Sequence, residues 1–182
     1  AFFTVTKDKT RPFIVETPAG AVRVTGTVFN VRADSSSSLE VLVVEGAVQV
    51  RPGEAASGRA PAPFLLGPGD RLTAGAGHVS VQPLSASAMD DALAWRHGQI
   101  VFDGVPLRDA LARFARYHGR GITASPAVAN LRVGGRYGLD DLDAFLTALE
   151  VVLPVRVSRD LNGTVQVSAI EQAPPSPGHG DQ

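Results

Sequence analysis

Apolar and polar residues alternate with the period of a β-strand through the first half of the chain. Successive strand residues face opposite sides, so strict alternation favours strands with one buried face. The alternating runs are short, rich in Val, Thr and Phe, and separated by Gly, Pro, Ser and Asp clusters. They are FFTV, RPFIVET, AVRVTGTVFNVRA, LEVLVVEGAVQV and HVSVQP. We therefore predict an all-β domain over residues 1–85.

Three alternating stretches of this half each open with a glycine. GAVRV begins at Gly20, GAVQV at Gly46 and GHVSV at Gly77. The unequal spacing argues against a regular repeat array. The shared pattern nevertheless indicates stacked β-arches of similar shape, in a solenoid-like arrangement.

The alternation loses its phase at Gly26-Thr27. The apolar residues before this dipeptide have even numbers, whereas those after it, Phe29 and Val31, have odd numbers. Such a change means that the chain bulges, bends or changes sheet. A second change of phase occurs at Gly46. Two changes at two glycines favour sheet corners as their common cause.

Residues 94–170 follow a different pattern. Apolar residues at helical spacing predict two helices, which end near Gly119 and Pro154. Their apolar stripes are Leu107, Ala110, Leu111 and Phe114, and Leu142, Phe145, Leu146 and Leu149. Strand-helix-strand occurs twice, and a last strand, GTVQVSAI, is expected to pair with PVRVSRD through a turn at 161–163. The expected fold class is mixed: an all-β domain, then an α+β domain (βαβ-βαβ with an added hairpin strand).

Four segments are expected to lie outside these domains. Residues 86–93 form the predicted linker between domains 1–85 and 94–170. Residues 35–38 and 51–63 are polar or rich in Pro and Gly, as exposed loops are. The Pro-rich residues 171–182 are expected to be a disordered tail.

Composition narrows the function. The chain has 182 residues, 44% hydrophobic and 19% charged, with a formal net charge of −1 and no cysteine. Near-neutral charge means that no global field attracts nucleic acid or acidic membranes. Without cysteine there are no disulfides and no thiolate chemistry. The sequence begins without methionine and contains no apolar run of about 18 residues. We expect a fragment of a longer protein whose anchor lies outside it.

Conventional catalytic motifs are scarce. The four histidines have no metal-ligand spacing, and no GxSxG motif marks a hydrolase serine. The glycine-rich stretches GPGD and RVGGRYG lack the lysine of a phosphate-binding loop. We therefore expect no metal, no cofactor, no small-molecule ligand and no conventional enzyme activity.

The first predicted helix has a basic side. Arg113, Arg116 and Arg120 lie on roughly one face. One interpretation is a solvated helix face, since exposed faces are normally charged. The other is a docking surface for an acidic protein. Nucleic acid is the weakest candidate, because no aromatic residues that could stack on bases accompany the arginines.

Two predicted strands, QIVFDG and RVGGRYG, offer edges to which a partner's strand could add. The alternative is that the neighbouring domain covers these edges. The candidate partner-binding residues from the strands and the helix are Ile100, Val101, Phe102, Arg113, Arg116, Arg120, Arg132, Val133, Arg136 and Tyr137.

Three motifs in the first half resemble the periplasmic domain of the FecR family, the transmembrane regulators of iron-responsive sigma factors. They are Arg-Pro-Phe at 11–13, Gly-Thr-Val-Phe-Asn-Val at 26–31 and Glu-Gly-x-Val-x-Val at 45–50, in the family's order and spacing. The segment AWRHGQIVFDGVPLRDALARFARYHG is similar to the one that follows that domain. The remainder resembles the short STN domain shared by secretins and TonB-dependent receptors. The family's domain normally has further β-structure upstream, and this chain begins partway through it.

The resemblance implies a signalling role. The fragment would lie in the periplasm of a Gram-negative bacterium, anchored to the inner membrane by a helix that this sequence lacks. Its STN-like half would receive the N-terminal signalling domain of a TonB-dependent siderophore transporter. Periplasmic and intramembrane proteases would then release an ECF sigma factor, which the missing cytoplasmic region binds. The alternative is a structural STN-like module of a secretin-type envelope assembly.

The resemblance also gives the Gly26-Thr27 bond a second interpretation. Some family members cut themselves between these two motif residues by an N-to-O acyl shift. The Thr27 hydroxyl would attack the Gly26 carbonyl carbon, and the amide C–N bond would break to leave an ester and a free Thr27 amine. Water would then hydrolyse the ester and complete the cut. The simpler interpretation, a corner glycine followed by a good strand former, stands beside it.

Overall fold

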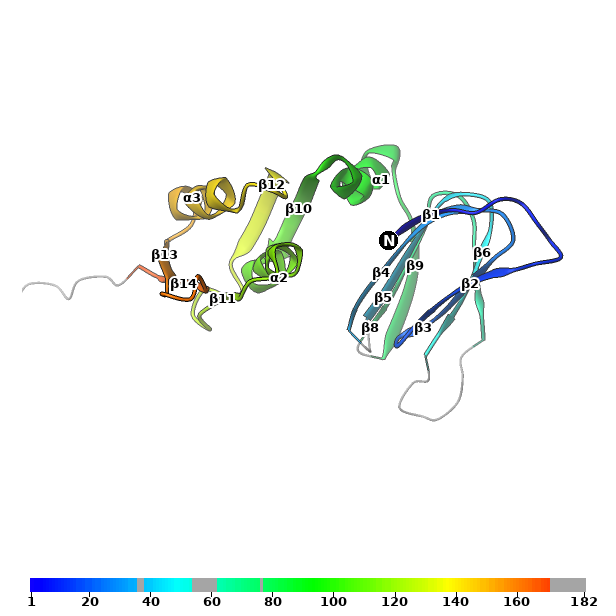
Figure 1. Ribbon diagram of the computed structural model, residues 1–182, viewed down its shortest axis with the longest axis horizontal. Helices are drawn as coiled ribbons and strands as arrows, with labels where there is room; N and C mark the ends of the chain where they lie inside the picture. The colour runs from blue at the N-terminus through cyan, green and yellow to red at the C-terminus, as the bar shows by residue number, and fades with distance from the viewer. Residues whose placement is uncertain (36–37, 54–61, 76, 171–182) are drawn as a thin grey trace, which may run out of the picture. The chain divides into compact units, whose positions relative to one another are not determined.

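The computed structural model describes residues 1–35, 38–53, 62–75 and 77–170. The chain forms two compact units, Ala1–Asp90 and Asp91–Gln182 (Figure 1). Each unit has its own hydrophobic core, and each is described by itself. The predicted disordered tail lies outside the described residues, as do the central residues of both predicted loops.

The first unit is all-β, as its sequence predicts, and forms a sandwich of two antiparallel sheets. The larger sheet has the order β1-β4-β5-β8-β9, and the smaller has the order β2-β3-β6-β7. The strands of the larger sheet are β1 (Phe2–Thr4), β4 (Val28–Ser35), β5 (Ser38–Glu45), β8 (Asp70–Gly75) and β9 (His78–Pro83). Those of the smaller are β2 (Phe13–Thr17), β3 (Gly20–Val24), β6 (Val48–Pro52) and β7 (Phe64–Leu66).

The core of this unit consists of alternate strand residues from both sheets. Val22 and Val24 come from β3, and Leu39, Val41 and Val43 come from β5; all are buried. Burying one such side chain contributes about 1.5–3 kcal/mol. The period-two pattern of the sequence therefore predicts which residues lie on the inner faces of the two sheets.

The chain changes sheets at both predicted corners. It leaves β3 in the smaller sheet and enters β4 in the larger one across residues 25–27. It returns from β5 to β6 across residues 46–47. These crossings confirm the corner interpretation of the lost phase. The solenoid-like arrangement is wrong, because all neighbouring strands pair antiparallel, whereas stacked arches would build parallel sheets.

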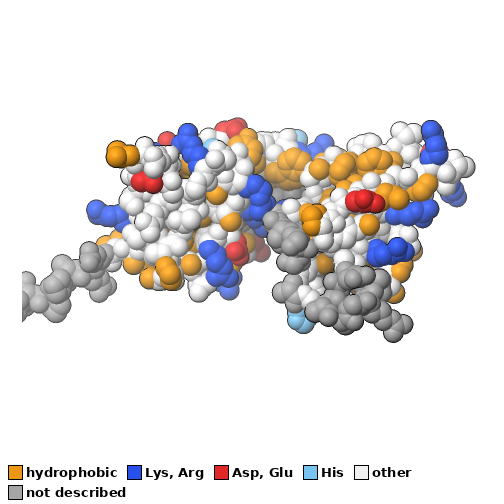
Figure 2. Space-filling view, turned by 60° about the horizontal axis from the view of Figure 1, so that its bottom comes forward, with side chains coloured by type: hydrophobic (Ala, Val, Ile, Leu, Met, Phe, Trp, Pro, Cys, Tyr) orange, Lys and Arg blue, Asp and Glu red, His pale blue; other side chains and the backbone are white. Residues whose placement is uncertain are grey.

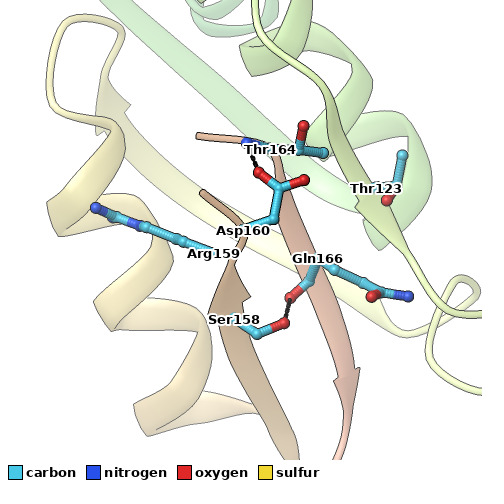
Figure 3. A pocket seen from close by; sticks show the side chains of 6 residues that line it. All are labelled: Thr123, Ser158, Arg159, Asp160, Thr164 and Gln166. Carbon is cyan, nitrogen blue, oxygen red and sulfur yellow. Dashed lines mark hydrogen bonds between the residues drawn. The ribbon is translucent and has the colours of Figure 1, made fainter. Parts of the chain in front are cut away.

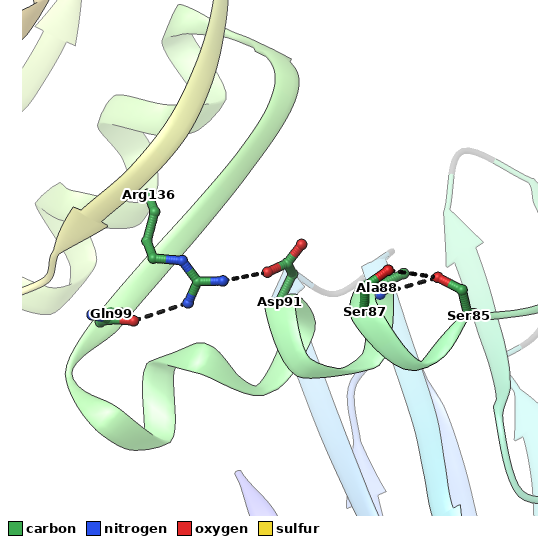
Figure 4. Close-up of polar contacts among 6 residues, drawn as sticks. All are labelled: Ser85, Ser87, Ala88, Asp91, Gln99 and Arg136. Carbon is green, nitrogen blue, oxygen red and sulfur yellow. Dashed lines mark hydrogen bonds and ion pairs between the residues drawn. The ribbon is translucent and has the colours of Figure 1, made fainter.

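The predicted linker forms a helix, α1 (Ala86–Leu93), followed by the 3₁₀ turn η1 (Ala94–His97). The Ser85 hydroxyl accepts a hydrogen bond from the Ala88 N–H at 3.2 Å, which caps the first turn (Figure 4). A serine before an alanine-containing run is a helix-start signal that the linker prediction overlooked.

The second unit contains two small sheets and two further helices. Its elements are β10 (Gln99–Pro106), α2 (Leu107–His118), β11 (Ile122–Ala124), β12 (Arg132–Gly138), α3 (Leu142–Val152), β13 (Val155–Arg159) and β14 (Val165–Ala169). β10 pairs only with β12, and the other sheet has the order β11-β14-β13. This chain order of strands and helices is the one the sequence predicts, including the antiparallel β13–β14 hairpin.

Aromatic rings fill the centre of this unit. Phe114 of α2 and Phe145 of α3 are fully buried, with ring centroids 4.2 Å apart and an interplanar angle of 11°. Phe102 of β10 packs against both rings at about the same separation, 6.3 and 6.0 Å. Asp141 caps the N-terminus of α3, because its carboxylate accepts from the Ala144 N–H at 2.9 Å.

Two features are absent from the part of the chain that the structure describes. No helix there is long and apolar enough to cross a membrane. No cluster of His, Cys, Asp or Glu there could hold a metal ion.

Candidate functional site

At the Gly26-Thr27 corner of the first unit, Thr27 is buried and Gly26 is half-buried. Thr27 is only 3% exposed, and its hydroxyl donates to the Ala47 carbonyl at 3.0 Å. Its backbone exchanges two hydrogen bonds with Val5, at 3.0 and 3.1 Å. The residue is therefore held by the first segment of the chain on one side and by the second corner on the other.

Glycine is required at this corner by both conformation and space. Gly26 has φ +136°, in a region that L side chains rarely adopt. A Cβ on Gly26 would lie 2.5 Å from the Lys7 Cα, which is backbone and cannot turn away. The second corner is as tight: a Cβ on Gly46 would lie 2.8 Å from the Gly26 carbonyl oxygen and 3.1 Å from the Thr27 Oγ1. The two corners thus pack directly on each other.

A tight turn lies next to this corner. The Asp8 N–H donates to the Thr25 carbonyl at 2.9 Å. The Asp8 carboxylate accepts from the Thr10 hydroxyl at 2.7 Å, from the Arg11 guanidinium at 2.8 Å and from the Thr10 N–H at 2.9 Å. The hydrogen bonds from Thr10, then that from Arg11, lower the pKa of Asp8 to about 2. The Asp8 carboxylate is therefore ionised at neutral pH. Its hydrogen bonds stabilise the turn next to the backbone hydrogen bonds that residues 5–8 make with the corner.

The chemistry open to the corner follows from the partner of the hydroxyl. Attack on the Gly26 carbonyl carbon needs the Thr27 oxygen to lose its proton to a base. The described partner of that hydroxyl is a backbone carbonyl, which accepts a hydrogen bond but is not a proton acceptor at neutral pH. The closed arrangement therefore favours a structural hydroxyl, and attack requires the side chain to rotate away from Ala47.

Three of the predicted partner-binding residues in the second unit are core residues. Ile100, Phe102 and Val133 are 9%, 2% and 3% exposed. Their side chains point into the core because alternate residues of β10 and β12 face the helices. The prediction that these three side chains contact a partner is therefore wrong. Only the backbone groups of the three residues can make such contacts. Val101 and Tyr137 are half-buried.

The predicted arginines have different surroundings. The Arg113 guanidinium lies 5.6 Å from the centroid of the Phe102 ring, a cation–π contact. Arg132 donates to the Gly104 carbonyl at 2.9 Å. Arg116 and Arg120 are exposed on or just beyond α2. The helix face is therefore less uniformly basic than its sequence suggests.

Arg136 joins three elements within the second unit. Its guanidinium donates to the Gln99 side chain at 2.9 Å and forms an ion pair with Asp91 at 2.6 Å (Figure 4). The ion pair links β12 to the C-terminal part of α1, which begins the second unit at Asp91. Arginine and lysine side chains are scattered over the face seen in Figure 2 and form no single patch there, which gives no support to nucleic-acid binding.

One hollow in the second unit was not predicted. It has a volume of about 350 Å³ and is lined by Thr123, Ser158, Arg159, Asp160, Thr164 and Gln166 (Figure 3). Thr123, Gln166 and Ser158 lie in one row across three strands. Asp160 accepts from the Thr164 N–H at 2.7 Å and Arg159 pairs with Asp143, so these charges serve the hairpin and α3. Polar residues on one face of neighbouring strands are the sequence signal from which this hollow could have been predicted.

Comparison with known proteins supports the family resemblance. Residues 1–49 match the family model described as FecR protein. This matched segment contains the Arg-Pro-Phe and Gly-Thr-Val-Phe-Asn-Val motifs. No curated protein matches the chain by sequence.

Two crystal structures of a protein described as a "putative anti-sigma factor" from Parabacteroides distasonis ATCC 8503 share the fold. In the 1.65 Å structure, the match covers 93% of this chain and 77% of the other, with a TM-score of 0.77 and 24% identity. The 2.50 Å structure matches with a TM-score of 0.76, 24% identity and coverage of 93% and 76%. The fold likeness covers 93% of the chain, and by sequence residues 1–49 are similar to the FecR family.

Proposed function

We propose that this chain is the periplasmic, signal-receiving region of a FecR-type regulator of a sigma factor. The FecR match at residues 1–49 carries the proposal and supports a role in sigma-factor regulation. The fold likeness to the Parabacteroides protein agrees with it. In this role the second unit, as an STN-like domain, docks the N-terminal signalling domain of a TonB-dependent siderophore transporter. The ECF sigma factor binds a cytoplasmic region outside this sequence, and proteases transmit the signal.

The strand edges of the second unit support docking. β10 and β12 form a sheet of two strands, so in the described part of the chain each has one edge that no neighbouring strand pairs. Gly134 and Gly135 of β12 carry no side chains of their own, although the Tyr137 ring lies over Gly135 and its hydroxyl donates to the Gly134 carbonyl at 2.8 Å. A partner strand can add to such an edge through backbone hydrogen bonds. Arg120, exposed just beyond α2, supplies positive charge for an acidic partner.

Calorimetric titration of the chain with the signalling domain of its cognate transporter tests this docking. We expect one-to-one binding, weakened about three- to tenfold by Arg120→Glu, since a charge at the edge of an interface alters association modestly. Arg23→Glu is the matched control: it makes the same charge change on an exposed β3 residue of the first unit and should leave the affinity unchanged.

The outcomes separate the proposal from its details. Absence of binding under native conditions contradicts the docking role. Binding that Arg120→Glu leaves intact contradicts only the contribution of the basic residue. Large homo-oligomers without transporter binding favour the structural, secretin-type module.

A second candidate activity, self-cleavage at Gly26-Thr27, rests on the match to the FecR family and requires the Thr27 hydroxyl to rotate away from the Ala47 carbonyl. The bond joins a positive-φ glycine to a buried hydroxyl residue. The fragments would remain together after a cut, because β1 pairs with β4 and β3 pairs with β6 across the break.

Intact mass after purification under denaturing conditions tests the cleavage. We expect two fragments that divide after Gly26 in the wild type and in Thr27→Ser, which keeps a hydroxyl nucleophile, and one uncut chain in Thr27→Val. Thr27→Val also loses the hydrogen bond to Ala47, at a cost of about 1–2 kcal/mol in stability. A single uncut wild-type chain ends the cleavage idea and leaves the signalling role intact.

A further inference from the structure

Among the residues that the structure describes, no strand pairs with the outer side of β9, the edge strand of the larger sheet in the first unit. It is the last strand of the larger sheet, and all six of its residues, His78–Pro83, are exposed. The other outer strands of the unit are shorter, and β2 carries Glu16. β9 has neither Lys, Arg, Asp nor Glu. Natural proteins usually protect a long edge with charge, so an uncharged edge of this length is a pairing surface.

The valines of β9 extend the face of the hydrophobic core. Val79 lies opposite Ala74 and Val81 opposite Leu72 in the β8–β9 ladder, and directly opposed residues share a face. Ala74 and Leu72 are buried in the core, whereas Val79 and Val81 remain 37% and 43% exposed. The inner face of the sandwich therefore continues onto β9, where it is left partly uncovered.

The backbone of these two valines points away from β8. The Leu84 N–H donates to the Gly69 carbonyl at 2.8 Å, which makes these residues a hydrogen-bonded pair in the β8–β9 ladder. Hydrogen-bonded and non-bonded pairs alternate in an antiparallel ladder. Val79 and Val81 occupy the non-bonded positions, so their N–H and C=O groups face outward. Pro83 also faces outward, where its missing N–H costs nothing.

We propose that two copies of this chain form a twofold dimer through β9. The sequence around Ser80 is a palindrome, Val-Ser-Val. Antiparallel pairing about Ser80 sets Val79 of each copy opposite Val81 of the other. The outward backbone groups then meet in the hydrogen-bonded positions, and all four valines lie on the same face. Every opposed pair in this register is free of Lys, Arg, Asp and Glu, so no like charges oppose each other.

The expected dimer is weak. Stable interfaces bury about 1,200–2,000 Å² in total, and pairing of two short edge strands buries less. We therefore expect a dissociation constant of roughly 10–1,000 μM. Membrane anchoring would raise the local concentration of the chain and so favour the dimer. A twofold contact closes on itself, so assembly should stop at two copies.

Sedimentation equilibrium of the full 182-residue chain, from about 10 μM to 1 mM, tests the dimer. Ser80→Lys and Ser80→Glu each place like charges directly across the twofold axis on the exposed face, and each should weaken the dimer about fivefold or more. An equimolar mixture of the two variants should restore pairing as a heterodimer. Leu65→Lys, on the 77% exposed Leu65 of β7, is the control and should dimerise as the wild type does.

Each result decides for or against the proposal. Weakening by both Ser80 variants, with rescue in their mixture, supports pairing about Ser80. A monomer up to 1 mM, assembly beyond a dimer, or weakening without rescue overturns it. A dimer that the Ser80 variants leave unchanged also overturns it, since another surface must then hold the two copies. Circular dichroism of the variants checks that the fold is retained.

Discussion

Gly26→Ala is expected to lower the free energy of unfolding of the first unit by about 3–5 kcal/mol. An L side chain at φ +136° is strained by about 1–3 kcal/mol. The new Cβ would also lie 2.5 Å from the Lys7 Cα, and forced overpacking of this kind costs about 1–3 kcal/mol more. Relief of the clash moves residues 5–8 away from the corner and breaks the hydrogen bonds between Val5 and Thr27. Urea unfolding followed by two-dimensional NMR measures the loss unit by unit.

Gly69→Ala is the matched control for this effect. Gly69 lies in the same unit and has φ +87°, but nothing lies within 4 Å of the position its Cβ would take. We expect a loss of about 1–2 kcal/mol, from backbone strain alone. Equal losses in the two variants would show that the Lys7 contact contributes nothing.

The parity of apolar residues was enough to predict both corners of the first unit. Val24 and Phe29 each lie on an inner face, and the change of sheet between them accounts for their different parity. The same pattern could not predict that the corners touch each other. The contact of Gly46 with Gly26 and Thr27 depends on how two sheets pack over a separation of 20 residues along the chain. It also could not separate a parallel stack of arches from an antiparallel sandwich, because both bury alternate residues.

The surroundings of the residues in the proposed docking surface were harder to predict for a related reason. β10 and β12 carry apolar residues that suit an exposed recognition strand as well as a core strand. Which side of Phe102 is covered depends on where α2 and α3 pack, and the structure gives that side to Phe114 and Phe145. Arg113 shows the same limit: helical spacing places it on the basic side, but its guanidinium covers the Phe102 ring. Spacing within one element does not report contacts between elements.

The two compact units have separate cores, and their stabilities should therefore be separable. The first core consists of aliphatic strand residues and Phe29, whereas the second depends on aromatic rings carried by helices and β10. A signal receiver with separate units can lose the fold of one while the other remains. In the proposed role, such local unfolding would expose backbone to a protease without releasing the whole domain.

Phe114→Ala is expected to destabilise the second unit by about 3–5 kcal/mol, the usual cost of removing a buried phenylalanine. Phe114 is fully buried, and the substitution also removes its stacking on Phe145. Val152→Ala, on the 76% exposed Val152 of α3, is the control and should change stability by less than about 0.5 kcal/mol. In the same NMR-monitored urea titration, resonances of the second unit should unfold at lower urea while those of the first keep the wild-type midpoint. A shift of both midpoints together would contradict independent unfolding of the two units. A cavity around Phe114 can lower the stability of the first unit only if both units unfold in one transition.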